Sequence, residues 1–436
     1  MEVINDSNAN NKNKYITYFV FFILLLATIL KISAAATFVN WFDTQWYLSW
    51  AKGLQSGFFT AYSHVSTSQY PLDYPPIYLF PLYIIGKLYP SLSGYDPFVM
   101  ILIKSLPIIF DVAGGAIIYI LFKNKLGYEI AAALTIGYVF NPAVMYNSSY
   151  WGQTDSILIF IVICSFYAFE TKKPILGTVI FALGVLTKPQ LALFIPIILF
   201  ELFSKYKLSK ATKALSAGII TGIAVFAPFM IYSNKILLPF TIYFGNLSSY
   251  TCIDLNAFNF YGIFNLNWVS DIKPLISFNI LSIHIQITMH TISLIITMLI
   301  ISMALYLFAK AKIKSISLIS FIYMQFIFMI TTRMHERYQI VVIAFLIIAY
   351  LFLKDKRLLV LYAVLSLVIF INQASLLSGF YVQQYLTNWN VIFKYIQSVF
   401  SFVNMLALFY SVYVCYDIMI KGNIKQLQFG KGYSSD

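Results

Sequence analysis

The stretch IQITMHTISLIITMLIISMALYLF, residues 285–308, contains no Asp, Glu, Lys or Arg. As a helix, an apolar run of about 20 residues is long enough to cross a bilayer core roughly 30 Å thick. Similar stretches recur along the chain, for example at residues 18–34 and 398–416. Of the 436 residues, 60% are hydrophobic and 10% are charged, whereas soluble domains are about 25% charged. The sequence therefore predicts an all-α integral membrane protein that crosses the bilayer many times.

The formal net charge is +13, with 29 Lys and Arg against 16 Asp and Glu. No basic patch is interleaved with exposed aromatic residues, so the charge does not indicate nucleic-acid binding. Cytoplasmic loops of membrane proteins are rich in Lys and Arg, which accounts for the excess. The three cysteines, Cys164, Cys252 and Cys415, are far apart and lack metal-ligand spacing. No disulfide framework or structural zinc is expected.

About twelve membrane spans, within a range of roughly 11 to 13, account for the apolar segments. They are placed at residues 17–35, 98–122, 128–146, 154–171, 174–187, 190–203, 214–233, 285–308, 315–331, 338–353, 358–375 and 398–418. With the N-terminus in the cytoplasm, the cytoplasmic segments hold 19 of the 29 Lys and Arg residues. This distribution follows the positive-inside rule and supports the orientation.

Residues 75–90, PPIYLFPLYIIGKLYP, are apolar enough to resemble a further span. A full crossing there would place the downstream lysine clusters outside, and Pro81 and the aromatic residues suit an interfacial helix. We therefore expect interfacial helices in a long first outer loop, residues 36–97. The second long outer loop covers residues 234–284. We divide the chain into two transmembrane modules, residues 1–233 and 234–436.

This topology gathers polar residues from remote segments on the outer face. Asp43 (in WFDTQWY) and Asp73 (in PLDYPP) lie in the first outer loop, and YWGQTD at 150–155 lies between the third and fourth spans. The turns TKPQ at 187–190 and TRMHERY at 332–338 lie on the same face. Ionisable groups at a membrane edge are costly and usually functional, so we expect one convergent outer site.

Most of these residues also have a purely structural interpretation. Asp43 is a candidate helix N-cap, and Lys188 is a candidate snorkelling anchor, although it lies on the face that Lys and Arg otherwise avoid. The cations of the 332–338 turn could be ion-paired through Glu336, but two Arg and a His suit an anionic phosphate better. Two polar residues inside spans, Asp111 and Asn141, are expected to satisfy helix–helix contacts.

The order of the motifs resembles the GT-C superfamily of polyprenyl-phosphate-sugar-dependent glycosyltransferases. The motifs DYPP at 73–76, WGQTDS at 151–156, TKPQ at 187–190 and MHERY at 334–338 are individually weak. Their order, their spacing and their predicted location on the same side of the membrane make the combination specific. Within the superfamily, the chain is most similar to the dolichyl-phosphate-glucose glucosyltransferases of N-glycan assembly and to prokaryotic relatives of the second GPI mannosyltransferase. The resemblance runs from about Asp43 to Tyr338.

This resemblance implies a GT-C fold and a hexosyltransferase activity on the non-cytoplasmic face. The donor would be a polyprenyl- or dolichyl-phosphate-hexose, and the acceptor a lipid-linked glycan or another acceptor. The resemblance assigns the role of catalytic base to Asp43 and a place at the donor phosphate to His335. It leaves open whether the hexose is glucose or mannose.

The residue types support the same chemistry. A polyprenyl phosphate leaves as a stabilised anion, so one carboxylate must take the acceptor proton while cations neutralise the phosphate. Asp43 is the expected base, Asp73 is the reserve base, and single displacement would invert the anomeric carbon. The expected substrate-binding residues are Trp46, Tyr74, Trp151, Gln153, Asp155, Lys188, Gln190, Arg333, His335, Glu336 and Arg337.

Within this set, Lys188, Arg333, His335 and Arg337 are the expected phosphate ligands. Gln153 and Asp155 are expected to bind sugar hydroxyls, and Trp46 or Trp151 to stack on a sugar face. The first outer loop contains no Asp-x-Asp pair, so no obligatory metal or other cofactor is expected.

Two other classes of polytopic membrane protein are weighed against this interpretation. A transporter or flippase for a lipid-linked sugar would show internal repeats around broken helices at the bilayer midplane, and no repeat is evident. An oligosaccharide ligase usually has a large outer domain or metal-binding acids, and no outer loop here is domain-sized. A prokaryotic plasma membrane is favoured over the endoplasmic reticulum, and a monomer is the simplest expectation.

Overall fold

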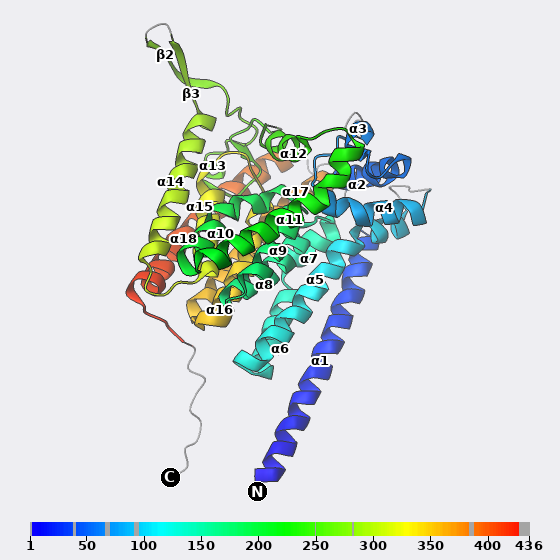
Figure 1. The fold of residues 1–436 in the computed structure, drawn as a ribbon, viewed down its shortest axis with the longest axis vertical. Helices are drawn as coiled ribbons and strands as arrows, with labels where there is room; N and C mark the ends of the chain where they lie inside the picture. Colours follow the sequence, from blue (N-terminus) through cyan, green and yellow to red (C-terminus); the bar gives the residue numbers. More distant parts are fainter. Residues whose placement is uncertain are drawn as a thin grey trace.

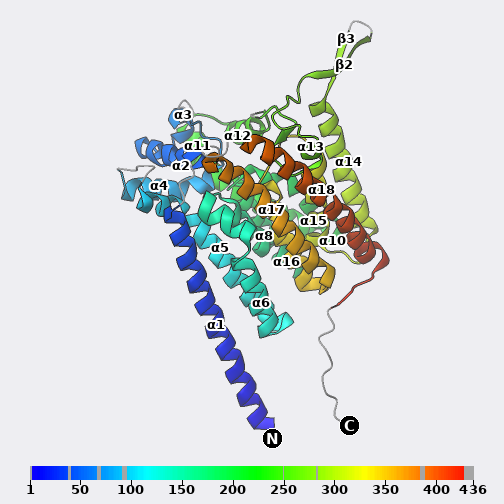
Figure 2. The ribbon, with the colours of Figure 1, turned by 180° about the vertical axis from the view of Figure 1, so that it is seen from behind.

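Helices make up 78% of the computed structural model, which describes residues 2–37, 41–65, 70–90, 96–248, 250–280, 283–382 and 388–426. Most of the helices pack side by side in one bundle (Figures 1 and 2). The helices of the bundle are α1 (Glu2–Thr37), α5 (Pro97–Leu126), α6 (Tyr128–Val139), α7 (Pro142–Met145), α8 (Asp155–Glu170), α9 (Pro174–Val185), α10 (Ile195–Lys205), α11 (Leu208–Tyr232), α14 (Met289–Lys310), α15 (Ile316–Ile330), α16 (Val342–Leu353), α17 (Lys356–Val382) and α18 (Trp389–Tyr416).

Each of the twelve predicted spans contains a helix of this bundle. Six described helices are long and apolar enough to cross a membrane, namely those at Asn11–Thr37, Pro97–Leu126, Leu208–Tyr232, Met289–Lys310, Lys356–Gly379 and Trp389–Lys421. The chain is an integral membrane protein. The remaining helices of the bundle are shorter, so the figure of about twelve crossings stays a prediction.

The middle of the bundle is built from helices that are apolar on every side. In α16, whose sequence is VIAFLIIAYLFL, every side chain except that of Phe352 is buried. Such all-round hydrophobicity is typical of a helix enclosed by other helices. α16 packs against α8, where the rings of Phe345 and Phe166 lie 4.8 Å apart between centroids. The two predicted modules are therefore in contact, and their boundary after residue 233 stays a prediction.

Two ionisable or amide side chains inside the bundle illustrate how buried polar groups are paired there, since an unpaired charge is costly in an apolar medium. Asp111 of α5 forms an ion pair with Lys31 of α1, and both side chains are fully buried. The Ser148 hydroxyl also donates to Asp111, at 2.6 Å. Asn141 caps α7 and donates to Ser366 of α17 at 2.7 Å. The prediction that Asp111 and Asn141 satisfy helix–helix contacts is confirmed.

One end of the bundle carries short helices that run across the direction of α1. They are α2 (Trp41–Gly53), α3 (Ala61–His64) and α4 (Leu79–Leu88) (Figure 1). α4 lies within residues 75–90, the segment predicted to be an interfacial helix. Its orientation fits that prediction, because a spanning helix would run along the bundle instead.

The prediction of an all-α chain missed a β-hairpin. Strands β2 (Pro274–Ile280) and β3 (Ile283–Thr288) pair in antiparallel fashion and project from the end of α14 beyond the bundle (Figures 1 and 2). The same loop holds α12 (Leu238–Ser248), α13 (Phe260–Ile263) and the short strand β1 (Asp254–Leu255). β1 pairs in parallel with β4 (Met334–His335), which lies between α15 and α16.

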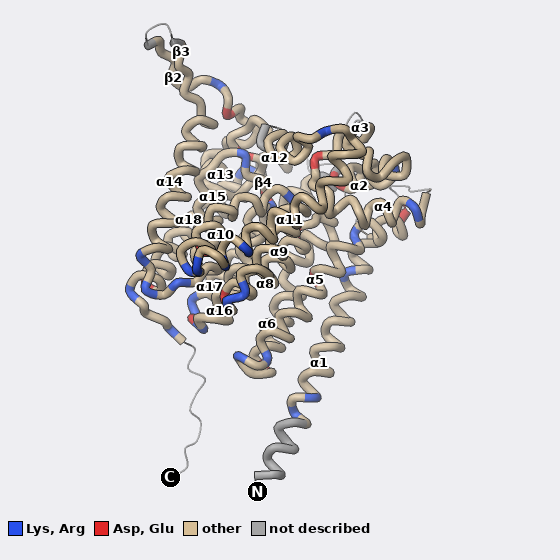
Figure 3. The backbone as a smooth tube through the Cα atoms, in the orientation of Figure 1, with Lys and Arg blue, Asp and Glu red and all other residues tan. Residues whose placement is uncertain are grey.

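Charged residues are concentrated away from the middle of the bundle. Many Lys and Arg residues gather around the ends of α6, α10 and α16, at the end opposite to α2, α3 and α4 (Figure 3). These include the lysine clusters that the sequence predicts to be cytoplasmic. The two ends of the bundle therefore differ in charge, as the positive-inside rule leads one to expect.

Candidate active site

The candidate base Asp43 lies in the first turn of α2 and is held by a residue more than a hundred positions away. The indole N–H of Trp151 donates a hydrogen bond to a carboxylate oxygen of Asp43. Trp151 ends a π-helical turn, Tyr146–Trp151, and Gly152 follows with φ of 80°. That conformation favours glycine, because a Cβ atom is strained at positive φ.

Lys104 of α5 is hydrogen-bonded to the backbone of this π-helical turn. Its side chain is fully buried, and its ammonium donates to the Tyr150 carbonyl at 2.8 Å. A Cβ atom added to Gly152 would come within 2.8 Å of the Lys104 side chain. Lys104 and Gly152 thus fit each other closely, and together they place the Trp151 indole against Asp43.

Asp155 and Lys188 form a second buried pair. The Lys188 ammonium donates to Asp155 at 2.5 Å, and the two side chains are 4% and 3% exposed. The other carboxylate oxygen of Asp155 accepts from Asn147 at 3.1 Å, and Asn147 also donates to Gln373 at 3.3 Å. Burial lowers the pKa of the Lys188 ammonium, although the Asp155 carboxylate acts in the opposite direction.

The DYPP motif lies close to the Asp155–Lys188 pair through its residues Asp73 and Tyr74. The Lys188 ammonium lies 5.9 Å from the centre of the Tyr74 ring. Burial raises the pKa of the Asp73 carboxyl to about 6, although the nearby charges of Lys188 and Arg337 lower it. Gln153 is also buried and accepts a hydrogen bond from the Tyr47 hydroxyl at 3.3 Å.

The 332–338 turn supplies the remaining charges. Arg337 pairs with Glu336, and its guanidinium lies 5.7 Å from the centre of the Trp151 ring. Burial favours the neutral form of Glu336, but Arg337 and His335 outweigh it and lower its pKa to about 2. Burial lowers the pKa of His335, so this imidazole is mainly neutral near pH 7.

These residues act on one another electrostatically. The charges of Glu336, Asp43 and Asp155 raise the pKa of Arg337 against the effect of burial. The charges of Asp155 and Asp43 likewise raise the pKa of Lys188 against the effect of burial, whereas that of Arg337 lowers it. The structure therefore brings together the four polar segments that the sequence predicts to converge, and it does so at the end of the bundle that carries α2.

Arg333 is placed differently from the other predicted phosphate ligands. Its guanidinium makes two hydrogen bonds to Asp271, at 2.6 and 3.1 Å. Asp271 is fully buried at the base of the hairpin, and His290 lies 3.6 Å away. This bidentate ion pair gives Arg333 a structural partner and sets it apart from Lys188, His335 and Arg337.

Two further predicted residues lie at the margin of the site. Gln190 lines a small cavity together with Asp155 and Tyr338, and its side-chain oxygen is buried with no hydrogen-bond partner among the described residues. Trp46 packs edge-on against Trp50 and Tyr70, with ring centroids 6.2 and 5.4 Å away. Trp46 therefore belongs to an aromatic cluster of the first loop.

The sequence analysis did not single out Lys104 and Tyr250 at the site, nor Asp271, the partner of Arg333. The ring of Tyr250 meets His335 edge-on, with centroids 4.8 Å apart. Lys104 carried a usable signal, because it lies near the outer end of a predicted span, where positive charge is depleted. Tyr250 and Asp271 lie in the loop 234–284, which has no recognisable motif, so nothing in their local sequence pointed to the site.

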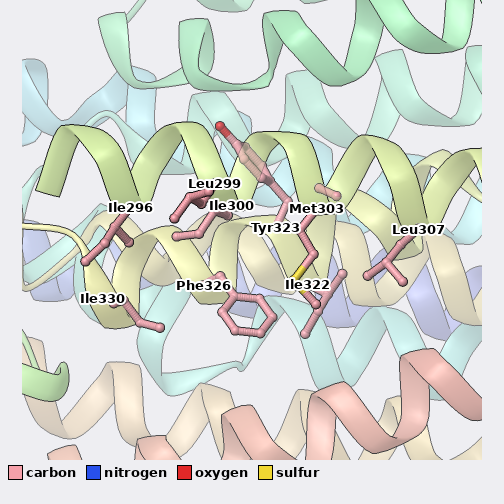
Figure 4. A pocket seen from close by; sticks show the side chains of 10 residues that line it. Ile296, Leu299, Ile300, Met303, Leu307, Ile322, Tyr323, Phe326 and Ile330 are labelled. Carbon is pink, nitrogen blue, oxygen red and sulfur yellow. The ribbon is translucent and has the colours of Figure 1, made fainter. Parts of the chain in front are cut away.

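An apolar cavity of about 170 Å³ lies between α14 and α15. Figure 4 shows side chains of both helices around it, from Ile296 and Ile330 at one end to Leu307 at the other. Ile330 is the last residue of α15 and directly precedes the turn that carries Arg333, His335 and Arg337. The cavity thus begins beside the cationic turn and extends along the two helices.

No protein-family model matches this chain, and no curated protein matches its sequence. Its fold is similar to that of ArnT, a GT-C glycosyltransferase, in the crystal structure of the Cupriavidus metallidurans protein bound to undecaprenyl phosphate. That match has a TM-score of 0.50 and 12% identity, and covers 92% of this chain and 77% of ArnT. The chain shares the overall fold of this ArnT. The apo structure of the same ArnT matches with a TM-score of 0.48 and 12% identity, over 93% of this chain and 78% of ArnT.

The ArnT-like fold agrees with the resemblance found in the motifs, which rests on different observations. The structural match covers most of the chain, whereas the motifs cover the segments between Asp43 and Tyr338. No group of three His, Cys, Asp or Glu residues that could hold a metal ion occurs in the described part of the chain.

The assignment of Arg333 leads to a stability test. We expect Arg333→Met to lower the free energy of unfolding by about 3–5 kcal/mol, because it leaves the buried Asp271 carboxylate without its partner. Thermal unfolding of the purified protein in detergent measures the effect. Lys273→Met is the matched control, since it removes a positive charge at an exposed position in the loop that holds Asp271. Equal unfolding temperatures for the two variants would contradict the structural role of Arg333.

Proposed function

We propose that the protein is an inverting GT-C glycosyltransferase. It transfers a hexose, glucose or mannose, from a polyprenyl- or dolichyl-phosphate donor to a lipid-linked glycan or another acceptor. The observation that carries this proposal is the contact of Trp151 with both Asp43 and Arg337. One ring thereby separates a carboxylate that can accept a proton from a cation that can hold a phosphate.

Asp43 is the catalytic base in this proposal. It takes the proton of the acceptor hydroxyl as that oxygen attacks the anomeric carbon, and the bond from this carbon to the phosphate oxygen breaks. The charges of Lys188 and Arg337 neutralise the leaving polyprenyl phosphate. His335, which lies in the same turn as Arg337, contacts the phosphate as well. Preorganised cations at a developing anion are usually the largest contribution to catalysis. Attack opposite the leaving group inverts the anomeric configuration.

The proposed path of the donor lipid runs along the apolar cavity between α14 and α15. Its lining from Ile296 to Leu307 is apolar and suits an isoprenoid chain, and its Ile330 end lies beside the turn of His335 and Arg337. A phosphate at the turn would thus continue into a lipid chain along the two helices. The undecaprenyl phosphate bound in the structurally similar ArnT is a lipid of this class.

The site faces the non-cytoplasmic side in this proposal. The end of the bundle that carries α2 and the candidate site is opposite to the end around which many Lys and Arg residues gather (Figure 3). The positive-inside rule places the lysine-rich end in the cytoplasm. We propose the plasma membrane of a prokaryote as the location, with the active site outside the cytoplasm.

The central test is sugar transfer by the purified protein. Radiolabelled polyprenyl-phosphate-glucose and polyprenyl-phosphate-mannose are offered with a membrane lipid extract as acceptor. We expect transfer from one donor, and a loss of at least about 100-fold in Asp43→Asn with donor binding retained, because general base catalysis supplies 10²–10⁴-fold. Transfer undiminished in Asp43→Asn would move the role of base to Asp73. A folded wild type that transfers neither sugar would favour a transporter of lipid-linked sugars.

Trp151→Phe tests the hydrogen bond to the base alone. The substitution keeps an aromatic ring beneath Arg337 but removes the N–H that orients Asp43. We expect kcat to fall about tenfold, because a hydrogen bond to a charged group is worth roughly 1.5–3 kcal/mol, with little change in the KM of the donor. A change in donor KM with an unaltered kcat would instead support stacking of Trp151 on the sugar.

Asp73 provides a pH test. Its pKa of about 6 means that the carboxyl is neutral at lower pH and ionised at higher pH. The ionised form competes with the donor phosphate for Lys188 and Arg337. We therefore expect the donor KM to rise between about pH 5 and 7 in the wild type. In Asp73→Asn this rise should disappear, and a variant that keeps the same pH dependence would refute the assignment.

A further inference from the structure

The loop 234–284 reaches the candidate site at Tyr250. Shortly after this residue the backbone runs beside the turn that carries His335, because the Arg333 N–H donates to the Ile253 carbonyl at 3.3 Å and β1 pairs with β4. The Tyr250 ring meets the His335 ring edge-on, with centroids 4.8 Å apart. These contacts hold Tyr250 beside the turn whose residues bind the donor phosphate in the proposed function.

The segment before Tyr250 is anchored near the other cationic turn. The Tyr243 hydroxyl of α12 donates to the Val185 carbonyl at 2.8 Å. Val185 is the last residue of α9 and lies three positions before Lys188. The loop is thus attached close to Lys188 as well as close to His335, and Tyr250 lies between the two attachments in the sequence.

The Tyr250 hydroxyl lies within reach of the charges of the site. Burial raises the pKa of this phenol, and the charges of Arg337, Asp73 and Asp43 also act on it. In the proposed reaction the hexose is joined to the phosphate held by Arg337, and Asp43 takes the proton of the attacking hydroxyl. The sugar must therefore lie between Arg337 and Asp43. Tyr250, on which both charges act, borders the same space.

Among the aromatic residues placed at the site above, Tyr250 has the most exposed ring. Tyr250 is 41% exposed, whereas Trp151 is 3% exposed. The exposure of the other rings is intermediate, namely for Trp46, Tyr74 and Tyr338. The ring of Tyr250 is thus fixed by His335 and still available for contact with a ligand.

We propose that Tyr250 binds the sugar of the lipid-linked donor by stacking its exposed ring on an apolar face of the hexose. A pyranose carries C–H groups on its faces and hydroxyls at its edge, so it offers an apolar surface to an aromatic ring. Tyrosine combines an apolar body with a polar tip and loses little conformational entropy on binding. This inference rests on the proposed function, and it assigns the sugar contact to the loop 234–284 rather than to Trp46 or Trp151.

The test measures equilibrium binding of undecaprenyl phosphate, undecaprenyl-phosphate-glucose and undecaprenyl-phosphate-mannose to the full-length protein in detergent. We expect Tyr250→Leu to weaken binding of the preferred sugar-bearing lipid about tenfold. Its affinity for undecaprenyl phosphate should not change, because only the sugar contacts the ring. Tyr250→Phe keeps the ring and should restore most of the affinity. Tyr395→Leu is the matched control, since it removes a tyrosine ring that is 71% exposed on α18.

The comparison of the lipids separates a sugar contact from a structural effect. Equal losses for undecaprenyl phosphate and its sugar conjugate would show that Tyr250 acts on the phosphate through His335, and would overturn the proposal. So would an unchanged affinity in Tyr250→Leu, or a loss in Tyr250→Phe as large as that in Tyr250→Leu. A wild type that binds neither sugar-bearing lipid would refute the proposed function and this inference with it, whereas the other results refute only the role of Tyr250.

A second measurement probes the position of the sugar directly. A saturating sugar-bearing lipid should slow the reaction of Tyr250→Cys with a maleimide, and undecaprenyl phosphate should slow it much less. The wild type shows the background of the three natural cysteines, and Tyr395→Cys should react at the same rate with either lipid. Equal protection of residue 250 by the lipids with and without a sugar would contradict the proposal.

Discussion

The ion pair between Lys188 and Asp155 is the interaction on which the candidate site depends. Two charges taken out of water must be close together and fully hydrogen-bonded to be tolerated. Here the Lys188 turn follows α9, Asp155 begins α8, and Asn147 connects the pair to Gln373 of α17. Segments that are remote in the sequence are thereby fixed at one end of the bundle. The remaining residues of the site are arranged around this pair.

The placement of the base follows from a departure from regular helix geometry. A π-helical turn and the left-handed Gly152 end the segment between α7 and α8, and Trp151 of this turn is buried against Asp43. π-Helical turns inside helices are frequently found at functional sites. The indole then contacts Asp43 through its N–H and Arg337 through its ring face. The proposed proton acceptor and the proposed phosphate ligand are thus held by a single rigid side chain.

Much of this arrangement could be predicted from the sequence because it depends on local patterns. Apolar runs and lysine clusters place the helices, and Asp43, Lys188 and His335 stand out as ionisable residues at predicted membrane edges. The pairing of Arg333 with Asp271 could not be predicted, because Arg333 looks like its neighbour Arg337 and its partner lies in a loop without a motif. The hairpin was missed because its apolar alternation continues directly into the apolar run of α14.

The short parallel pairing of β1 with β4 has a consequence for how the two substrates interact. Backbone hydrogen bonds join the loop 234–284 to the turn of His335, and Asp254 of β1 is held in turn by Gln397 of α18, at 2.9 Å. A ligand that displaces this loop must also displace the turn. The free energies of binding at the two places are then linked, and such linkage is reciprocal. In the proposed transferase, an acceptor that binds at the loop 234–284 would therefore change the affinity of the His335 turn for the donor, and the two substrates would bind in a preferred order.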